Sequence, residues 1–349
     1  MFFGRSNGTV YEGLLDWHAA NLEFSMGAPL GEVCNRWWNF DDAHAYPGHH
    51  WLLRDGLGAL ATSLLADAGV ELRAAHAASA VCARASGGVT VAARALTPGG
   101  GELTVDADAA VVALPLGVLK SGDVAFDPPI SHAKRAAVAR MGFGLLNKVV
   151  LEFEKAFWSA EEGRDFFGLV RGGVAREGSV GSGGCEAGGE SRGECFMFWN
   201  LQECTGRAVL LGLLAGDAAH ESETRSDDVV VARARAALLT IFKHVPPHVH
   251  VHVTRYVTRH SRCLCPPDVV SSGNGGRRWG AEEFSRGSYS FIRAGSGCGP
   301  QDLVELGRPE GPIFFAGEHT SLTHPSSVHG ALLSGIRAAG LVLHALSMG

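Results

Sequence analysis

The stretch Gly311-Pro-Ile-Phe-Phe-Ala-Gly-Glu-His-Thr320, near the C-terminus, decides the fold of this chain. Its residues 313–316 form a short apolar run closed by Gly317, which is typical of a strand covered on both faces. A polar loop follows, and a long helical pattern begins near Pro325 or Ser326. A buried strand, a loop and a long helix in this order predict an α/β protein.

The carboxyl end of this strand is a candidate ligand site. Glu318 and His319 lie where the strand ends, and α/β proteins bind ligands at such ends. The free N–H groups of the next helix favour an anion or a partly negative ring, and Gly317 and Gly330 let a ligand approach the backbone. A solvated Glu-His corner fits the same residues, so these features alone leave both interpretations open.

Length and composition indicate a globular protein. The 349 residues are enough for two domains, and 46% of them are hydrophobic. No apolar run approaches the roughly 20 residues that a membrane span needs, so we expect no contact with a membrane. Residues 1–8 lack the basic and then apolar build of a signal peptide, which predicts an intracellular protein.

Charge and cysteine usage exclude two classes of function. The net charge of -6 argues against direct nucleic-acid binding led by phosphates and favours a cationic partner. The eight cysteines are scattered, without a CxxC pair or the spacing of a zinc site. His248, His250 and His252 alternate along one strand face, but no carboxylate or cysteine stands nearby, so we predict no metal site.

Two further groups of residues could carry chemistry. Lys148 begins an apolar strand after Gly142 and Gly144; such a lysine is usually solvated, although a desolvated amine loses its charge readily. Asp41 and Asp42 are flanked by aromatic residues and could hold a cationic peptide by charge and cation–π contact. A solvated acidic loop is an equal alternative for this pair.

Three motifs resemble one enzyme family. Phe315-Ala-Gly-Glu-His-Thr, His324-Pro-Ser-Ser-Val-His-Gly-Ala-Leu-Leu-Ser-Gly and Gly142-Phe-Gly-Leu-Leu-Asn-Lys-Val look like segments of the flavin-dependent amine oxidases, in particular the lysine-specific histone demethylase-like branch. The resemblance covers nearly the whole chain, except a Gly-rich insert at 172–193 and a second insert at 257–278. It implies FAD as the cofactor.

The resemblance also implies which residues contact FAD. In the family the glutamate contacts the ribose and the helix start lies under the pyrimidine end of the flavin, roles that fall to Glu318, Ser327 and Val328. Phe284 stands where this branch usually has a tryptophan; it keeps the apolar contact and loses the indole N–H. The remaining implied cofactor contacts are Ala78, Leu114, Pro115 and Trp279.

Catalytic and substrate residues are implied in the same way. Lys148 matches the family's flavin-facing lysine, which can hold a water for hydrolysis of an imine or for reoxidation by oxygen. Tyr289 matches one wall of an aromatic cage in front of the flavin, which excludes water. Positions that line the substrate channel or face the histone tail are Asn21, Phe24, Asp41, Asp42 and His50.

The implied reaction is oxidation of an amine by hydride transfer to FAD, hydrolysis of the resulting imine and reoxidation by oxygen to give hydrogen peroxide. With methyl-lysine of a histone tail as substrate, the other product is formaldehyde, and the expected location is the nucleus. A polyamine oxidase is one alternative, because its substrates are also cationic amines. A catalytically inactive fragment or scaffold without FAD is the other.

The expected architecture is α/β, with an incomplete Rossmann-like FAD-binding domain and a mixed-sheet substrate domain flanked by helices. Both are discontinuous: residues 45–143 and 298–349 are expected to form the FAD-binding domain, and residues 1–44 and 144–297 the substrate domain. The family's N-terminal Gly-rich FAD motif does not occur in these residues, nor does the helical insertion by which this branch docks its corepressor.

Overall fold

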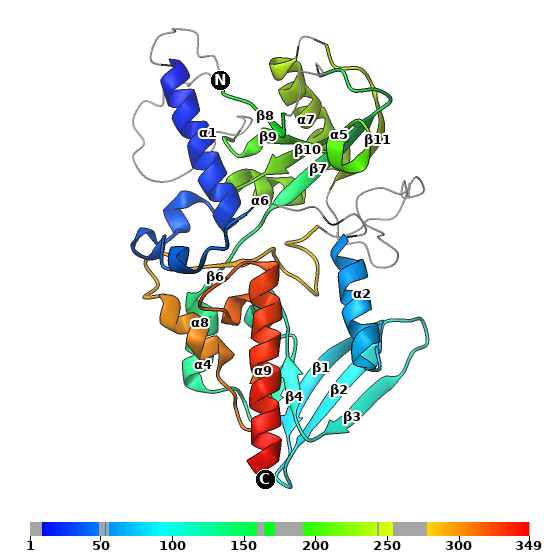
Figure 1. Cartoon of the computed structure of the whole chain (residues 1–349), viewed down its shortest axis with the longest axis vertical. Coiled ribbons are helices and arrows are strands. Elements are labelled where there is room, and N and C mark those ends of the chain that lie inside the picture. The colour runs from blue at the N-terminus through cyan, green and yellow to red at the C-terminus, as the bar shows by residue number, and fades with distance from the viewer. Residues whose placement is uncertain are drawn as a thin grey trace. The chain divides into compact units, whose positions relative to one another are not determined.

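The computed structural model describes residues 9–48, 53, 56–158, 164–171, 191–242, 244–253 and 278–348. The chain divides into two compact units, and Figure 1 labels most of their helices and strands. The first unit comprises Met1–Gly31, His49–Asp67 and Leu145–Glu282, and the second comprises Glu32–Gly48, Ala68–Gly144 and Glu283–Gly349.

The first unit is built on a five-stranded sheet with strand order β11-β7-β10-β9-β8. Every neighbouring pair of these strands is antiparallel. Apolar runs such as residues 209–214, buried on both sides, carry no mark of strand direction in the sequence. The strands are β7 (Asn147–Phe153), β8 (Phe166–Gly168), β9 (Glu194–Asn200), β10 (Val209–Leu214) and β11 (His248–Val253). The helices are α1 (Thr9–Met26), α2 (Gly56–Ala68), α5 (Gln202–Thr205), α6 (Asp217–Thr224) and α7 (Asp227–Ile241).

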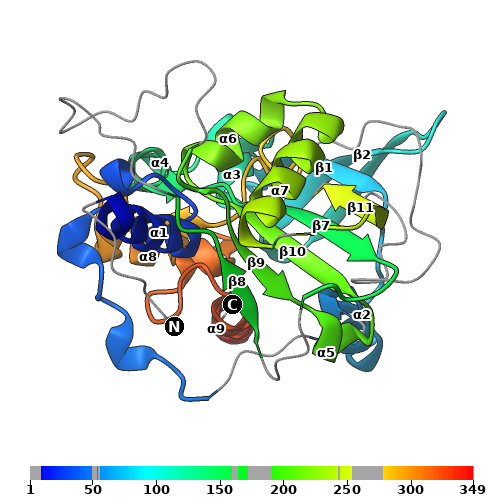
Figure 2. The same cartoon turned by 90° about the horizontal axis from the view of Figure 1, so that it is seen from above.

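The core of the first unit lies between this sheet and α7. Alternate residues of β7 are buried, among them Val149, Leu151 and Phe153, as the period of a strand requires. Helix α7 packs Ala234 and Leu238, both fully buried, against the same core, and it lies across the sheet in Figure 2. The strand thereby turns one face inward and leaves Lys148 on the other.

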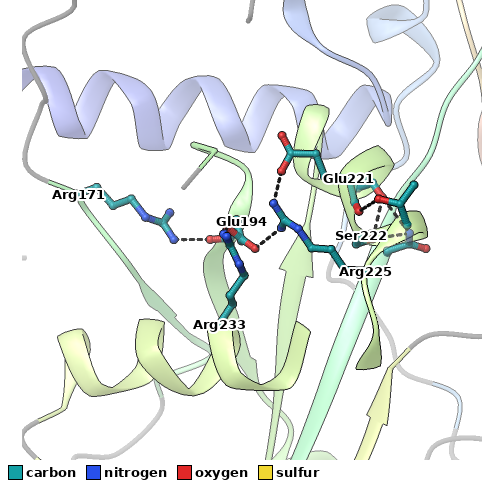
Figure 3. A network of polar contacts seen from close by, with 9 residues as sticks. Arg171, Glu194, Glu221, Ser222, Arg225 and Arg233 are labelled. Carbon is teal, nitrogen blue, oxygen red and sulfur yellow. Dashed lines mark hydrogen bonds and ion pairs between the residues drawn. The ribbon is translucent and has the colours of Figure 1, made fainter. Parts of the chain in front are cut away.

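A buried carboxylate joins β9 to the helices. Figure 3 shows Arg225 and Arg233 pointing at the carboxylate of Glu194, each donating to a different oxygen at 2.7 Å. Arg171 donates to the backbone carbonyl of the same residue at 2.6 Å. Because an unpaired buried charge is strongly destabilising, both oxygens need these partners.

The second unit contains three small sheets. One has the order β3-β2-β1-β5, with β1 and β5 parallel; β13 pairs with β4 in parallel, and β12 with β6 antiparallel. The strands are β1 (His76–Ala83), β2 (Val89–Ala95), β3 (Glu102–Ala107), β4 (Ala110–Val112), β5 (Ala125–Asp127), β6 (Gly142–Phe143), β12 (Ser290–Phe291) and β13 (Ile313–Phe315). The helices are α3 (Leu116–Ser121), α4 (His132–Arg140), α8 (Pro300–Gly307) and α9 (Val328–Met348), with 3-10 turns η2 (Asn35–Trp37), η3 (Asp42–His44) and η4 (Glu318–Thr320). A further turn, η1 (Leu30–Glu32), spans the chain position where the first unit gives way to the second.

The predicted strand, loop and helix at the C-terminus are β13, η4 and α9, which confirms the α/β class. The helix begins at Val328, two or three residues later than predicted. Ser326 has a left-handed φ of 57°, which no helical residue adopts, and the Ser327 hydroxyl accepts a hydrogen bond from the Gly330 N–H at 3.1 Å. Ser327 therefore caps α9.

Helix α9 is the longest apolar segment of the described chain. Its 21 residues include an 18-residue window with a mean hydropathy of 1.5, of which 11% is buried, so the helix is long and apolar enough to cross a membrane. The prediction that no run approaches this length was wrong, because the pattern continues through Arg337 and many small residues. One such helix does not by itself indicate a membrane, since core helices of soluble proteins can have the same length and composition.

The boundaries of the two compact units do not all coincide with the predicted domain boundaries. The boundary after Gly144 lies within one residue of the predicted one at 143. The second unit, however, begins at Glu32 and resumes at Glu283, and the first unit includes His49–Asp67. Which unit holds the flavin and which the substrate stays a prediction.

Lys134 joins α4, α8 and β13 inside the second unit. Its side chain is 1% exposed, and its Nζ donates to the carbonyls of Glu305, Leu306 and Arg308 at 2.7, 2.9 and 2.9 Å. The ammonium also lies 4.1 Å from the centre of the Phe315 ring. Burial lowers the pKa of this amine to about 8. Lys134 thus satisfies the last carbonyls of α8.

We expect Lys134→Met to lower the free energy of unfolding by about 3 kcal/mol, because three carbonyls lose their donor inside the protein. Lys120→Met is the matched control: Lys120 donates to the Val138 and Ala139 carbonyls at the end of α4, but it is exposed, so water can replace it. We expect a loss of about 1 kcal/mol there. Urea unfolding followed by circular dichroism measures both, and equal losses would contradict this role for Lys134.

Candidate functional site

Glu318 is the centre of a polar cluster at the end of β13. Its carboxylate accepts hydrogen bonds from the Ser290 N–H at 3.1 Å, the Ser290 hydroxyl at 2.6 Å and the Ser326 N–H at 2.8 Å. Burial raises the pKa of this carboxyl, and the three donors oppose that shift. The arrangement brings residues from β12, η4 and the start of α9 to one carboxylate.

Helix α9 holds the chain on both sides of Glu318. The Ser334 hydroxyl accepts from the Gly317 N–H at 2.8 Å, and Arg337 donates to the Thr320 carbonyl at 2.6 Å and to the Phe315 carbonyl at 3.1 Å. Gly317 has a φ of 129°, and a Cβ there would lie 2.5 Å from the His319 ring. Only glycine fits this turn, and the turn directs the Glu318 side chain toward Ser290.

The residues at the start of α9 complete the cluster. The Ser326 hydroxyl donates to the Ser290 carbonyl at 2.5 Å, and the Ser327 hydroxyl donates to the His324 carbonyl at 2.7 Å. A Cβ at Gly330 would clash with the His324 carbonyl, so glycine is needed for the chain to turn into the helix here. Val328, the first helical residue, is 54% exposed.

The acidic pair lies beside this helix start, within the same unit. Tyr46 stacks on the His324 ring with 4.7 Å between centroids, and a His324 ring nitrogen lies 2.9 Å from the His44 carbonyl. Burial and the neighbouring Asp42 raise the pKa of Asp41, while His324 and His44 oppose this shift. Asp41 is half-buried and Asp42 exposed.

Tyr289 is linked to Glu318 through its chain neighbour Ser290. Its carbonyl accepts from the Gly144 N–H at 2.7 Å, which aligns β12 with β6, and burial raises the pKa of its phenol above the usual 10. Phe284, half-buried, belongs to the same unit.

The other expected cofactor residues of the second unit lie elsewhere in it. Leu114 packs against a core cluster that includes Phe315. Pro115 precedes α3, and its carbonyl accepts from the Val118 N–H at 2.9 Å. Ala78 is exposed on β1 at the irregularity in its pairing with β2. No hydrogen bond described in the structure connects these three with Glu318.

Four expected site residues that the structure describes belong to the first unit. Lys148 lies opposite Leu213 of β10; it is half-buried, and burial lowers the pKa of its amine. On α1, Asn21 is half-buried and the Phe24 ring meets the Trp199 ring edge to face at 5.8 Å. Trp279 is also half-buried. His50 lies outside the described residues.

Three residues of the cluster were missed by sequence reasoning. The sequence indicated Ser326 only as a possible helix start, and His324 only as part of a motif. Ser290 is separated from Glu318 by 28 positions, and no local pattern pairs them. Among the described residues, no group of three or more His, Cys, Asp or Glu could hold a metal ion.

Comparison with known proteins gives consistent results. The family model for flavin containing amine oxidoreductase matches residues 1–343. Histone demethylase-like protein A of Aspergillus fumigatus is 35% identical, and the match covers 95% of this chain and 28% of that protein. Possible lysine-specific histone demethylase 1 of Drosophila melanogaster is 34% identical, over 94% of this chain and 34% of that protein. The chain therefore spans about a third of the length of these relatives.

A solved structure of putrescine oxidase bound to putrescine has the same fold. The TM-score is 0.59 at 18% identity, and the match covers 83% of this chain and 53% of that one. This likeness confirms the predicted flavin amine oxidase fold.

We predict that acid weakens the fold through His319, which is buried beside Glu318. Burial, followed by the charges of Lys134 and Arg337, lowers the pKa of this imidazole to about 4 from its usual 6.5. Between pH 6.5 and 4, the imidazole therefore binds a proton in the unfolded chain but stays neutral in the folded protein. The contribution of His319 to the free energy of unfolding is fully present above pH 6.5, and about 3 kcal/mol is lost as the pH falls toward 4.

Urea unfolding between pH 4 and 7 tests this, with His319→Leu expected to flatten the pH dependence. His132→Gln, which changes an exposed histidine, is the control and should unfold with the wild-type pH dependence. Equal slopes in the wild type and His319→Leu would refute the assignment to His319.

Proposed function

Because the chain belongs to the family of flavin containing amine oxidoreductases, we propose that it is part of an FAD-dependent enzyme that removes methyl groups from lysine side chains of histone tails. The observation that carries the proposal is the Glu318 carboxylate, held by Ser290 and Ser326 at the start of α9. The names of the relatives at 34–35% identity support the substrate and a nuclear location.

The residues around Glu318 fit a flavin nucleotide. One carboxylate oxygen accepts two hydrogen bonds and the other accepts one, which leaves acceptor capacity for a ribose hydroxyl. The first N–H groups of the 21-residue helix α9 favour an electron-rich ring or a phosphate. Gly317 and Gly330 keep side-chain atoms away from the backbone here. Glu318, Ser327 and Val328 would hold the cofactor.

When bound, the flavin supplies an acceptor for the hydride from the carbon beside the amine nitrogen. Lys148 would hold a water by hydrogen bonding, and its lowered pKa increases the neutral fraction of its amine. A neutral amine can accept a proton from the water that hydrolyses the substrate imine. Tyr289 would exclude bulk water with its ring, and its raised pKa keeps the phenol uncharged.

The charges suit a cationic substrate. Asp42 is exposed and Asp41 half-buried, and the chain carries a net charge of -6. Such a surface attracts the lysine and arginine side chains of a histone tail. It would also attract a polyamine, so the choice between these two substrates has to be measured.

The test is the visible spectrum of the purified chain with added FAD. We expect flavin bands that bleach without oxygen when a dimethyl-lysine histone-tail peptide is added, and not with the unmethylated peptide. In Lys148→Met the release of formaldehyde in the presence of oxygen should slow about a hundredfold, because general base catalysis of imine hydrolysis is lost, whereas the bleaching that precedes this step should persist. Bleaching by spermine alone would identify a polyamine oxidase, and a folded chain that takes up no FAD would refute the proposal for this chain.

We further expect Asp41→Asn/Asp42→Asn to raise the KM for the peptide about tenfold with little change in kcat, because the pair acts through binding. The effect should shrink as salt is added. Asp108→Asn, also in the second unit and in the turn before β4, serves as the control for a lost surface charge. A fall in kcat at constant KM would show that the pair does not bind the substrate.

A further inference from the structure

We propose that Asn147 and Glu223 are positioning residues, which together hold the strand of Lys148 and the segment of Trp279 in one arrangement. The inference rests on the proposed function, in which Lys148 is the catalytic amine. All four residues lie in the first unit, on β7, on α6 and in the segment at 279–281.

Asn147 anchors the beginning of β7 to α6. It is 1% exposed, and its amide nitrogen lies 2.7 Å from Glu223 Oε1, 2.9 Å from the Ser222 hydroxyl and 3.2 Å from the Ala219 carbonyl. The amide has two hydrogens for these three acceptors. The contact with the carboxylate is the shortest and, being charge-assisted, the strongest.

The orientation of this amide is determined by its surroundings. If the amide were rotated by 180°, its oxygen would face Glu223 Oε1 and the Ala219 carbonyl, both of which are acceptors. Asn147 Oδ1 instead points away from them, is buried and has no hydrogen-bond partner in the described structure. Only the observed orientation satisfies Glu223, so the side chain of Asn147 has one position.

The second oxygen of Glu223 holds the Trp279 segment. The Ala281 N–H donates to Glu223 Oε2 at 3.2 Å. A Cβ at Gly280 would lie 3.2 Å from the Glu223 carboxyl carbon and 3.4 Å from Leu145 Cδ2, so glycine allows the segment to pack closely here. One carboxylate thus connects the residue before Lys148 with a residue two positions after Trp279.

The position of Lys148 follows from this anchor. Neighbouring residues of a strand project to opposite faces, so fixing Asn147 against α6 sets the direction in which Lys148 leaves β7. Lys148 is half-buried, and burial lowers the pKa of its amine. If the start of β7 becomes mobile, water reaches the amine and its pKa rises.

The test uses an exchange of functional groups. In Glu223→Gln the new NH2 group faces either the Asn147 amide or the Ala281 N–H, both of which are donors, so one of these two hydrogen bonds is lost. In Asn147→Asp/Glu223→Gln, the new carboxylate accepts from the glutamine NH2, while the glutamine oxygen still accepts from Ala281. The new carboxylate also faces the Ala219 carbonyl, so the exchange restores the contact with residue 223 and not the one with Ala219. The pair keeps one carboxylate and one amide. Glu221→Gln, on the same helix and paired with Arg225 at 2.6 Å, is the matched control.

Two measurements are made on each variant. The first is the pH dependence of acetylation of the Lys148 amine, read by mass spectrometry, which needs no flavin. The second is the rate of formaldehyde release from the dimethyl-lysine peptide with FAD and oxygen present. We expect Glu223→Gln to move the acetylation midpoint to higher pH and slow this release about tenfold, as small misplacements of catalytic groups do. The double variant should regain part of both values, and Glu221→Gln should keep them.

Acetylation profiles of Glu223→Gln that match the wild type would overturn the proposal, and so would a folded double variant that regains neither property. If Glu223→Gln fails to fold, a folded double variant with the wild-type acetylation midpoint still supports the bridge, and an unfolded one refutes it. A third outcome separates the two proposals: Asn147→Asp/Glu223→Gln reverses the acetylation shift, but no variant, including the wild type, releases formaldehyde. This outcome would support the positioning role of Asn147 and Glu223 and refute the proposed function.

Discussion

Three segments of the second unit meet at the half-buried carboxylate of Glu318. Glu318 is placed after a strand by a glycine turn, and burial makes its charged form unfavourable unless donors surround it. Ser290 and Ser326 supply those donors, from β12 and from the residues just before α9. Satisfying this single group therefore brings three separate chain segments together, and it is these segments that carry the proposed flavin contacts.

The same constraint recurs through both units. Glu194 is paired with Arg225 and Arg233, and Lys134 is surrounded by three carbonyls at the end of α8. Asn147 and Glu223 repeat the pattern with an amide and a carboxylate. In each case a buried polar group is tolerated because its partners come from different elements, and the elements are consequently fixed against each other.

Lys148 and Glu318 illustrate two ways in which burial changes a titratable group. Burial lowers the pKa of the lysine amine and raises that of the glutamate carboxyl, because in each case the neutral form is favoured. For the amine, this change increases the fraction of the neutral form, which can act as a base. For the carboxylate, the serine donors limit the change and retain an acceptor. Perturbed groups of this kind are typical of functional sites.

Much of this protein was determined by the sequence itself. The apolar run at 313–316, Gly317 and the long pattern from about Pro325 predicted β13, its turn and α9, because strand and helix periods are local properties. The motifs around Lys148 and Glu318 also pointed to the family. What the sequence could not show was the antiparallel order of the sheet in the first unit, since runs buried on both faces carry no mark of direction.

The tertiary structure alone decided which distant residues meet. Ser290 reaches Glu318 across 28 positions, and Asn147 reaches Glu223 across 76. Neither pair has a spacing that any regular element would reproduce, and a serine or an asparagine in isolation reads as a cap or a turn residue. Such contacts are selected by the need to satisfy buried polar groups, which exists only after the chain has folded and water has been excluded.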